Sequence, residues 1–234
     1  MDATRIAELL QPFLGPADGQ RLTTNDLFNI STYIDLLLRW NARVNLTAIR
    51  QPEEIVTRHF GESLFAARHL FPARVAWGPL AKPALSEVEG AVQAEQGSAA
   101  HLLDIGSGAG FPGVPIKTWA THIHLTLIES NQKKATFLRE VARSLTLTNI
   151  NVFHGRAEDY NPPAEVVTLR AVERFDVTLP TATRLVAPAG RLALLIGEAQ
   201  IARAQQLTPE IAWSHPINVP LSSNRVLLIG TRNP

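Results

Sequence analysis

A glycine-rich turn between an apolar strand and a helix is the feature that most constrains this fold. Residues 102–113 read LLDIGSGAGFPG, so an apolar run ends in Asp104 and Gly-x-Gly-x-Gly follows. Glycine lets the backbone turn sharply and approach a ligand closely, because no Cβ stands in the way. The helix expected from Pro112 would direct free N–H groups toward that ligand. The segment predicts an α/β sheet that holds a nucleotide-like molecule at one strand end.

The acid before the first glycine indicates which molecule the turn would hold. A dinucleotide places a pyrophosphate at this helix start, where the carboxylate of Asp104 would repel it. S-adenosylmethionine (SAM) carries a sulfonium and an α-ammonium, so the same carboxylate would favour it. If the dinucleotide pattern G-x-G-x-x-G begins at Gly106, Phe111 stands where the third glycine is required. If it begins at Gly108, the three glycines are present, but the preceding strand would end too early. SAM is therefore the favoured cofactor, with a dinucleotide and a purely structural turn as alternatives.

The next expected strand, 123–129, ends in a second carboxylate. Glu129 follows Gly106 at close to the roughly 20-residue spacing at which a carboxylate binds ribose hydroxyls. Ser130 and Asn131 begin the following loop and could line the adenosine. The alternative is that Glu129 stabilises the start of the helix expected at 132–144. The two roles can coexist.

A third strand, expected at 150–153, leads into the segment 155–159 (GRAED). An adenine ring could lie over Ala157 there and contact the Glu158 side chain. A turn with a solvated acidic pair explains the segment equally well.

Arg170 is the candidate on the acceptor side of the site. It ends the strand expected at 166–170, and ligands of open α/β sheets bind beyond the carboxyl ends of the strands. We therefore expect Arg170 to face the cofactor or the group that receives the methyl. The alternative is a structural ion pair with Glu158 or Glu173.

Hydrophobic periodicity divides the chain into three parts. Residues 1–71 carry apolar stripes at helical spacing and predict a helical cap. Residues 72–100, rich in Ala, Pro, Gly, Glu and Ser, predict an exposed insertion or linker. Residues 101–234 alternate strands and helices, which predicts a mostly parallel sheet with helices on both faces. Seven strands are expected, near 101–105, 123–129, 150–153, 166–170, 190–196, 211–217 and 225–231. This pattern suits the Rossmann-like fold of class I SAM-dependent methyltransferases, whose last strand is antiparallel.

Composition excludes several kinds of chemistry. The chain has no cysteine, which rules out disulfides, thiolate zinc sites, cysteine-ligated iron–sulfur clusters and a cysteine nucleophile. His122 and His124 could share a strand face, but no third ligand lies near them in sequence, so no metal site is predicted. No apolar run approaches the roughly 20 residues that span a bilayer, and no signal-peptide pattern is present. We expect a cytoplasmic protein without membrane association.

The charge balance limits how the chain could bind nucleic acid. Its net charge is only +1, so binding would depend on local basic patches. Arginines are frequent between residues 39 and 68, and four basic residues (Lys133, Lys134, Arg139, Arg143) follow Glu129. An ordinary solvated helix face is the alternative explanation.

Assembled, these segments resemble the bacterial small-subunit ribosomal RNA guanine-N7 methyltransferases, also called the glucose-inhibited division protein B family. The resemblance rests on 37–41 (LLRWN), 44–47 (VNLT), 58–60 (RHF) with Ser63 and Leu64, 104–113 (DIGSGAGFPG), 156–158 (RAE) and 170–171 (RA). The Asn-Leu-Thr and Gly-Phe-Pro-Gly stretches are its most specific parts. With the resemblance added, the predicted cofactor-binding residues are Asp104, Gly106, Gly108, Gly110, Phe111, Glu129, Ser130, Asn131, Ala157, Glu158 and Arg170. Arg170 is also the predicted catalytic residue.

The resemblance implies methyl transfer from SAM to N7 of a guanine in 16S rRNA. The substrate would be either the free RNA or the RNA in an assembling small subunit, and the protein is expected to be a monomer. N7 carries an exposed lone pair, so in-line transfer needs no general base, and positioning would supply the catalysis. Three positions depart from the family: Glu62 replaces Asp, Leu169 replaces Ser, and Ile196 replaces the Lys of a Lys-Gly pair. If that lysine contacts RNA, this chain must compensate for it or bind more weakly. A small-molecule methyltransferase and a non-catalytic RNA- or ribosome-binding protein with a relic SAM pocket are the alternative functions.

Overall fold

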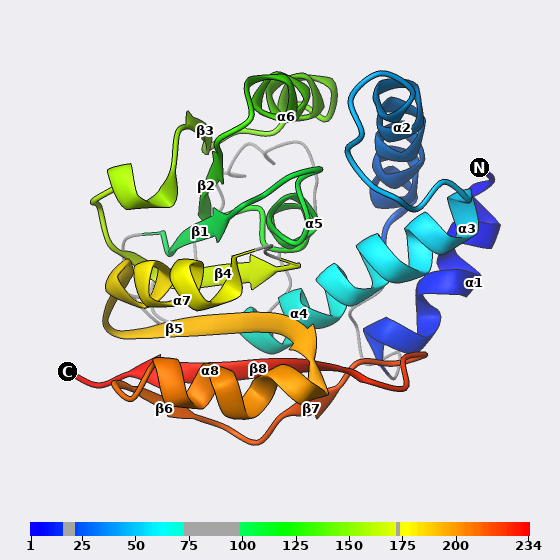
Figure 1. Cartoon of the computed structure of the whole chain (residues 1–234). Coiled ribbons are helices and arrows are strands. Elements are labelled where there is room, and N and C mark those ends of the chain that lie inside the picture. The colour runs from blue at the N-terminus through cyan, green and yellow to red at the C-terminus, as the bar shows by residue number, and fades with distance from the viewer. Residues whose placement is uncertain (16–21, 73–98, 172–173) are drawn as a thin grey trace, which may run out of the picture.

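The computed structural model describes residues 1–15, 22–72, 99–171 and 174–234. Within these ranges eight strands form one sheet of order β3-β2-β1-β4-β5-β8-β6, with β7 paired to β8 (Figure 1). The strands are β1 (His101–Ile105), β2 (His124–Glu129), β3 (Ile150–His154), β4 (Ala164–Arg170), β5 (Val186–Gly197), β6 (Ile211–Trp213), β7 (Ile217–Asn218) and β8 (Arg225–Arg232). Strands β1 to β5 are parallel, and β8 pairs antiparallel with β5, as the sequence predicts.

One strand prediction is wrong in detail. The strand expected at 211–217 is divided into β6 and β7, which pair with opposite ends of β8. Pro216 lies between them and has no N–H to donate to a neighbouring strand. The chain therefore leaves the sheet after Ser214, whose N–H still donates to the carbonyl of Ile229 (2.9 Å), and rejoins it at Ile217.

Side chains alternate between the two faces of the sheet, and each face has its own core. Leu102 and Leu127 point to one face, and Leu103 and Ile128 point to the other. The helices that cover the first face are α4 (Glu62–Leu70), α5 (Gly113–Trp119) and α6 (Gln132–Ser144). Helices α7 (Phe175–Arg184) and α8 (Ile201–Leu207) cover the second face (Figure 1). The parallel sheet with helices on both faces is as predicted.

The helices before the sheet pack on its first face. They are α1 (Ala3–Leu14), α2 (Thr24–Asn41), α3 (Pro52–Glu54) and the π-helix η1 (Ile55–Gly61), which runs directly into α4. Thr23 and Asp26 form a capping box at the start of α2, and Pro52 occupies the first position of α3. The predicted division at residue 71 stays a prediction. The predicted insertion, 72–100, lies almost wholly outside the described residues.

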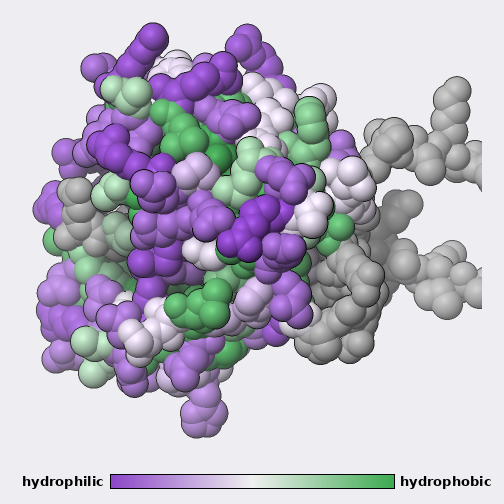
Figure 2. Space-filling view, turned by 90° about the vertical axis from the view of Figure 1, so that its right-hand side faces the viewer, coloured by the Kyte–Doolittle hydropathy of each residue, from purple (hydrophilic) through white to green (hydrophobic). Residues whose placement is uncertain are grey.

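The outer surface of these helices is mostly polar. Figure 2 shows this face, on which hydrophobic residues form small, separate groups between hydrophilic ones. None of the helices in the described ranges combines the length and the apolarity needed to cross a lipid bilayer.

Candidate functional site

The glycine-rich segment forms a tight loop between β1 and α5. Gly106, Gly108 and Gly110 have φ angles of 67°, 55° and 88°, in the left-handed region that favours glycine. Beneath the loop, Asp104 is completely buried. Its carboxylate accepts hydrogen bonds from the N–H of Gly113 (3.2 Å) and the hydroxyl of Thr168 (2.8 Å). Asp104 therefore fixes both ends of the loop.

Glu129 connects this loop to the end of β2. Its carboxylate accepts hydrogen bonds from the N–H of Gly108 (2.9 Å) and the N–H of Asn131 (2.7 Å). The side chain of Asn131 in turn caps α6 by accepting from the N–H groups of Lys133 (2.9 Å) and Lys134 (3.2 Å). The cap of α6 is therefore Asn131 and not Glu129, which holds Asn131 in place.

A cavity of about 340 Å³ opens above the loop, at the carboxyl ends of β1 to β4. This volume lies within the range of small-molecule sites, roughly 300–1,000 Å³. Seven predicted residues line it together: Gly106, Gly108, Glu129, Ser130, Asn131, Ala157 and Glu158. Its two carboxylates, Glu129 from β2 and Glu158 from the short helix η2 (Ala157–Asp159), line it together with three basic side chains, those of Lys134, Arg156 and Arg174.

Four predicted residues do not line this cavity: Arg170, which is described below, and three residues of the loop segment. Asp104 lies beneath the loop, and Gly110 faces the helices. The ring of Phe111 is stacked between His59 and Tyr33, with ring centroids 4.7 and 5.3 Å away. These residues support the loop from behind, and their predicted contact with a cofactor stays a prediction.

Several lining residues were not predicted from the sequence. Lys134 comes from the first turn of α6, and Arg174, Val177 and Thr178 come from the start of α7. Arg174, Val177 and Thr178 belong to the segment that follows β4, which lies at the carboxyl edge of the sheet. Their position in the chain could therefore have indicated them. Val177 is also one of the few large apolar side chains that are exposed among the described residues.

Arg170 lies in a second cavity, of about 350 Å³, which shares Ala171 with the first. Leu169, Ile196 and Arg225 also line it. Arg225 pairs in register with Gly197, next to Ile196. A positive charge therefore stands at the end of β5, where Ile196 replaces the lysine that the resemblance leads one to expect.

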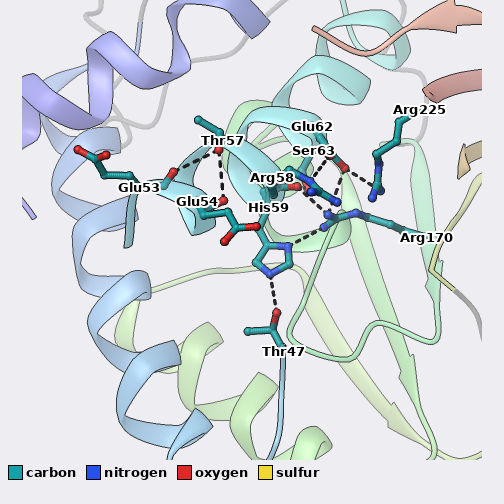
Figure 3. A network of polar contacts seen from close by, with 10 residues as sticks. All are labelled: Thr47, Glu53, Glu54, Thr57, Arg58, His59, Glu62, Ser63, Arg170 and Arg225. Atoms are coloured by element: carbon teal, nitrogen blue, oxygen red, sulfur yellow. Dashed lines mark hydrogen bonds and ion pairs between the residues drawn. The ribbon is translucent and has the colours of Figure 1, made fainter. Parts of the chain in front are cut away.

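Three arginines converge on one buried carboxylate beside this second cavity (Figure 3). Glu62 Oε1 lies 3.1 Å from Arg58 Nε, and Glu62 Oε2 lies 3.1 Å from Arg170 Nη2 and 2.8 Å from Arg225 Nη2. The partner of Arg170 is therefore Glu62, and the ion pair suggested with Glu158 is not formed. Glu173 lies outside the described residues. Burial lowers the pKa of Arg170 to about 10, so its guanidinium stays charged at neutral pH.

His59 holds Arg170 from the other side. Its Nδ1 lies 3.1 Å from Arg170 Nη1, and its Nε2 lies 2.8 Å from Thr47 Oγ1. Arginine can only donate, so Nδ1 must accept and Nε2–H must donate to Thr47. Burial, with Arg170 next to the ring, lowers the pKa of His59 to about 3, which keeps it neutral. Asn41 fixes the loop of Thr47 by accepting from the N–H groups of Leu46 and Thr47. Segments that carry the family resemblance thus meet in one network.

We expect His59 and Asp104 to have opposite effects on the pH dependence of stability. The pKa of His59, about 3 in the folded chain against 6.5 ordinarily, means that stability is lost as the pH falls from 6.5 toward 3. Burial raises the pKa of Asp104 from 3.8 to about 6, so its contribution to stability is lost as the pH rises through that interval. In wild type the two effects oppose each other between about pH 4 and 6.

The substitution Asp104→Asn removes one of these effects. The free energy of unfolding should then fall more steeply with acid in the variant than in wild type between about pH 6 and 4. Urea denaturation across this interval measures both slopes. Equal slopes would contradict the raised pKa of Asp104.

Comparisons with known proteins agree with this architecture. A family model described as rRNA small subunit methyltransferase G matches residues 26–77 and 85–225. The ribosomal RNA small subunit methyltransferase G of Chloroflexus aggregans is 34% identical over 227 residues, covering 92% of this chain and 85% of that protein. The protein of the same name from Streptococcus pyogenes serotype M49 is 30% identical over 225 residues, covering 91% of this chain and 85% of that protein.

A solved structure supports the fold class. Ribosomal protein L11 methylase from Lactobacillus delbrueckii subsp. bulgaricus matches with a TM-score of 0.51 at 12% identity, covering 58% of this chain and 71% of that chain. This likeness concerns the fold alone. Together with the order of the strands, it confirms the predicted Rossmann-like fold of SAM-dependent methyltransferases.

Proposed function

The chain belongs to the rRNA small subunit methyltransferase G family, and from this premise we propose that it methylates N7 of a guanine in 16S rRNA with SAM as the methyl donor. The observation that carries the proposal is the contact between two unlike cavities. The cavity above the glycine loop is lined by two carboxylates and three basic side chains, and the cavity beside it is lined by three arginines; the two meet at Ala171. The first offers partners to a cofactor that carries both positive groups and a carboxylate, and the second suits an RNA.

The residues of the first cavity offer SAM hydrogen-bonding groups and room beside the glycine loop. Glu129 and Glu158 offer carboxylate oxygens to hydroxyl and amino groups. A Cβ on Gly108 would meet only the carbonyl oxygen of Gly106, at 3.7 Å, so the loop leaves open space at this point. Asp104, with a pKa of about 6, is ionised at neutral pH and adds a negative charge beneath the loop. When bound, SAM supplies an electrophilic methyl group on a positively charged sulfur.

The acceptor side offers no free general base among the described residues of the network. The carboxylate of Glu62 is engaged by three arginines, and both ring nitrogens of His59 are hydrogen-bonded. This arrangement favours an acceptor that needs no deprotonation, and guanine N7 has a free lone pair. N7 faces the major groove, which is too narrow for side chains in regular A-form RNA, so we expect an irregular segment as the substrate.

Transfer of a labelled methyl group tests this function. The protein is incubated with tritiated SAM and with 16S rRNA or small subunits from cells that lack this gene. We expect incorporation into the RNA at a single guanine, which becomes sensitive to N7-specific chain cleavage. Methylation at another atom, or transfer only to a fraction of small metabolites, would overturn the proposal. Absence of SAM binding in calorimetry would instead favour the relic pocket.

Replacing Glu129 by Gln should weaken SAM binding about tenfold or more, because the amide can accept only one of the two backbone hydrogen bonds and lacks the charge. Calorimetric titration with SAM measures the dissociation constant. Asp159→Asn is the matched control, since Asp159 is exposed and is absent from the cavity lining. An equal effect of both substitutions would remove Glu129 from the site.

A further inference from the structure

The second cavity has a surplus of positive charge. The guanidinium groups of Arg58, Arg170 and Arg225 surround the single carboxylate of Glu62 (Figure 3). Three positive charges and one negative charge leave the cluster with two unbalanced positive charges. Water screens the charges of Arg58 and Arg225, whose side chains are 43% and 21% exposed, more than that of Arg170, which is 7% exposed.

Two buried donors in this cavity have no acceptor. The Nε–H groups of Arg170 and Arg225 are buried and lack a hydrogen-bond partner among the described residues. Glu62 Oε2, which lies at ion-pair distance from the Nη2 atoms of both arginines, also makes no hydrogen bond there. The side chain of Arg170 is 7% exposed, and both arginines line the cavity. Buried polar groups in proteins are nearly always hydrogen-bonded, so these donors indicate a ligand rich in acceptor oxygens.

We propose that the arginine cavity binds a backbone phosphate of the RNA, next to the nucleotide that receives the methyl. This inference rests on the proposed function and adds to it a subsite for the substrate. Phosphate carries the opposite charge, and its oxygens match the planar array of donors that arginine presents. Phosphate contacts fix the position of a nucleic acid without reading its sequence.

The chemistry of the reaction favours a phosphate over the target base in this cavity. Methylation at N7 turns a neutral base into a cation, which the surplus positive charge of the cluster would disfavour. An arginine donor placed on N7 would also occupy the lone pair that attacks the methyl group. A backbone phosphate avoids both conflicts and offsets one of the two surplus positive charges.

The surrounding network holds Arg170 in place before any ligand arrives. Its Nη2 donates to the carbonyl of Arg58 (2.6 Å), and its Nη1 donates to the neutral ring of His59. Arg58 and His59 are adjacent residues of the π-helix η1, and π-helical turns are frequent at functional sites. Arg225, whose side chain is 21% exposed, is freer to follow a ligand and is the residue to test.

Arg225→Gln should raise the KM for RNA about tenfold while kcat and the dissociation constant of SAM stay unchanged. The slope of log affinity for RNA against log salt concentration should decrease by about 0.7–0.9, the value expected for one lost phosphate contact. Arg225→Lys keeps the charge, so its KM for RNA and its salt slope should both be close to those of wild type. Arg203→Gln is the control, because Arg203 pairs with Asp176 on the surface and lies outside the cavity. An unchanged KM and salt slope in a folded Arg225→Gln protein would overturn the inference, and so would a raised KM with an unchanged slope.

A second measurement uses only the wild-type protein and inorganic phosphate. At equal ionic strength, phosphate should inhibit RNA methylation competitively with RNA and more strongly than chloride. Equal inhibition by the two anions would overturn the phosphate subsite and leave the proposed function intact. If the wild-type protein methylates no RNA, the proposed function fails. Calorimetric binding of inorganic phosphate, lost in Arg225→Gln, would then still support an anion site, and its absence would overturn it.

Discussion

Replacing Glu62 by Gln should lower the free energy of unfolding by about 3–5 kcal/mol, the cost of leaving buried charges without their partner. The carboxylate is the counter-charge for Arg58, Arg170 and Arg225, and it is buried with Arg170, whereas the other two arginines are partly exposed. An amide of nearly the same shape keeps the packing but removes the charge. The loss should therefore come from electrostatics, and urea denaturation measures it.

Two further variants separate charge from shape at this position. Glu62→Asp keeps the charge on a shorter side chain and should cost less than Glu62→Gln. Adding Arg225→Gln to Glu62→Gln removes one of the stranded charges, so the double variant should be more stable than the sum of the single effects implies. A loss below about 1 kcal/mol for Glu62→Gln would mean that water solvates the cluster as it does a surface ion pair.

Replacing Gly110 by Ala should cost about 2–5 kcal/mol, through overpacking and a left-handed backbone. A Cβ at this position would overlap the hydroxyl of Tyr33 and come within 3.0 Å of Val114 and 3.1 Å of Leu138. Tyr33 cannot move aside easily, because it is buried and its hydroxyl donates to the carbonyl of Ala109 (2.5 Å). Urea denaturation and calorimetric titration with SAM measure the losses of stability and of cofactor binding.

Gly108→Ala is the matched control for this substitution. Gly108 also has a positive φ, of 55°, but a Cβ there meets no side chain. Its cost should be limited to about 1–2 kcal/mol for the left-handed backbone. Equal losses in the two variants would show that the Tyr33 contact adds nothing to the cost at Gly110.

The sequence predicts those parts of the site that depend on local structure. The glycine loop, Glu129 and the start of α6 follow one another along the chain, and turn chemistry and strand order place them. Their positions at one edge of the sheet follow from the rule that parallel strands present their carboxyl ends together.

The acceptor side could not be predicted in the same way. Glu62 and Arg170 are more than a hundred residues apart, and their contact depends on how the early helices pack against the sheet. The sequence suggests only Glu158 and Glu173 as partners of Arg170, and nothing in it points to Glu62. Likewise, Asp104 was interpreted through the charge of a ligand, whereas its visible partners are Gly113 and Thr168. The burial that creates these contacts is a property of the whole fold.

The stacking of Phe111 has a consequence for how the protein unfolds. Its ring joins the glycine loop to Tyr33 on α2 and His59 on η1, and one continuous core contains residues of all three. The early helices and the sheet therefore form a single cooperative unit, in which neither half can melt without exposing the apolar surface of the other. A fragment that began at β1 would keep every strand of the sheet but would lose Tyr33 and His59, the side chains on which Phe111 of the glycine loop packs.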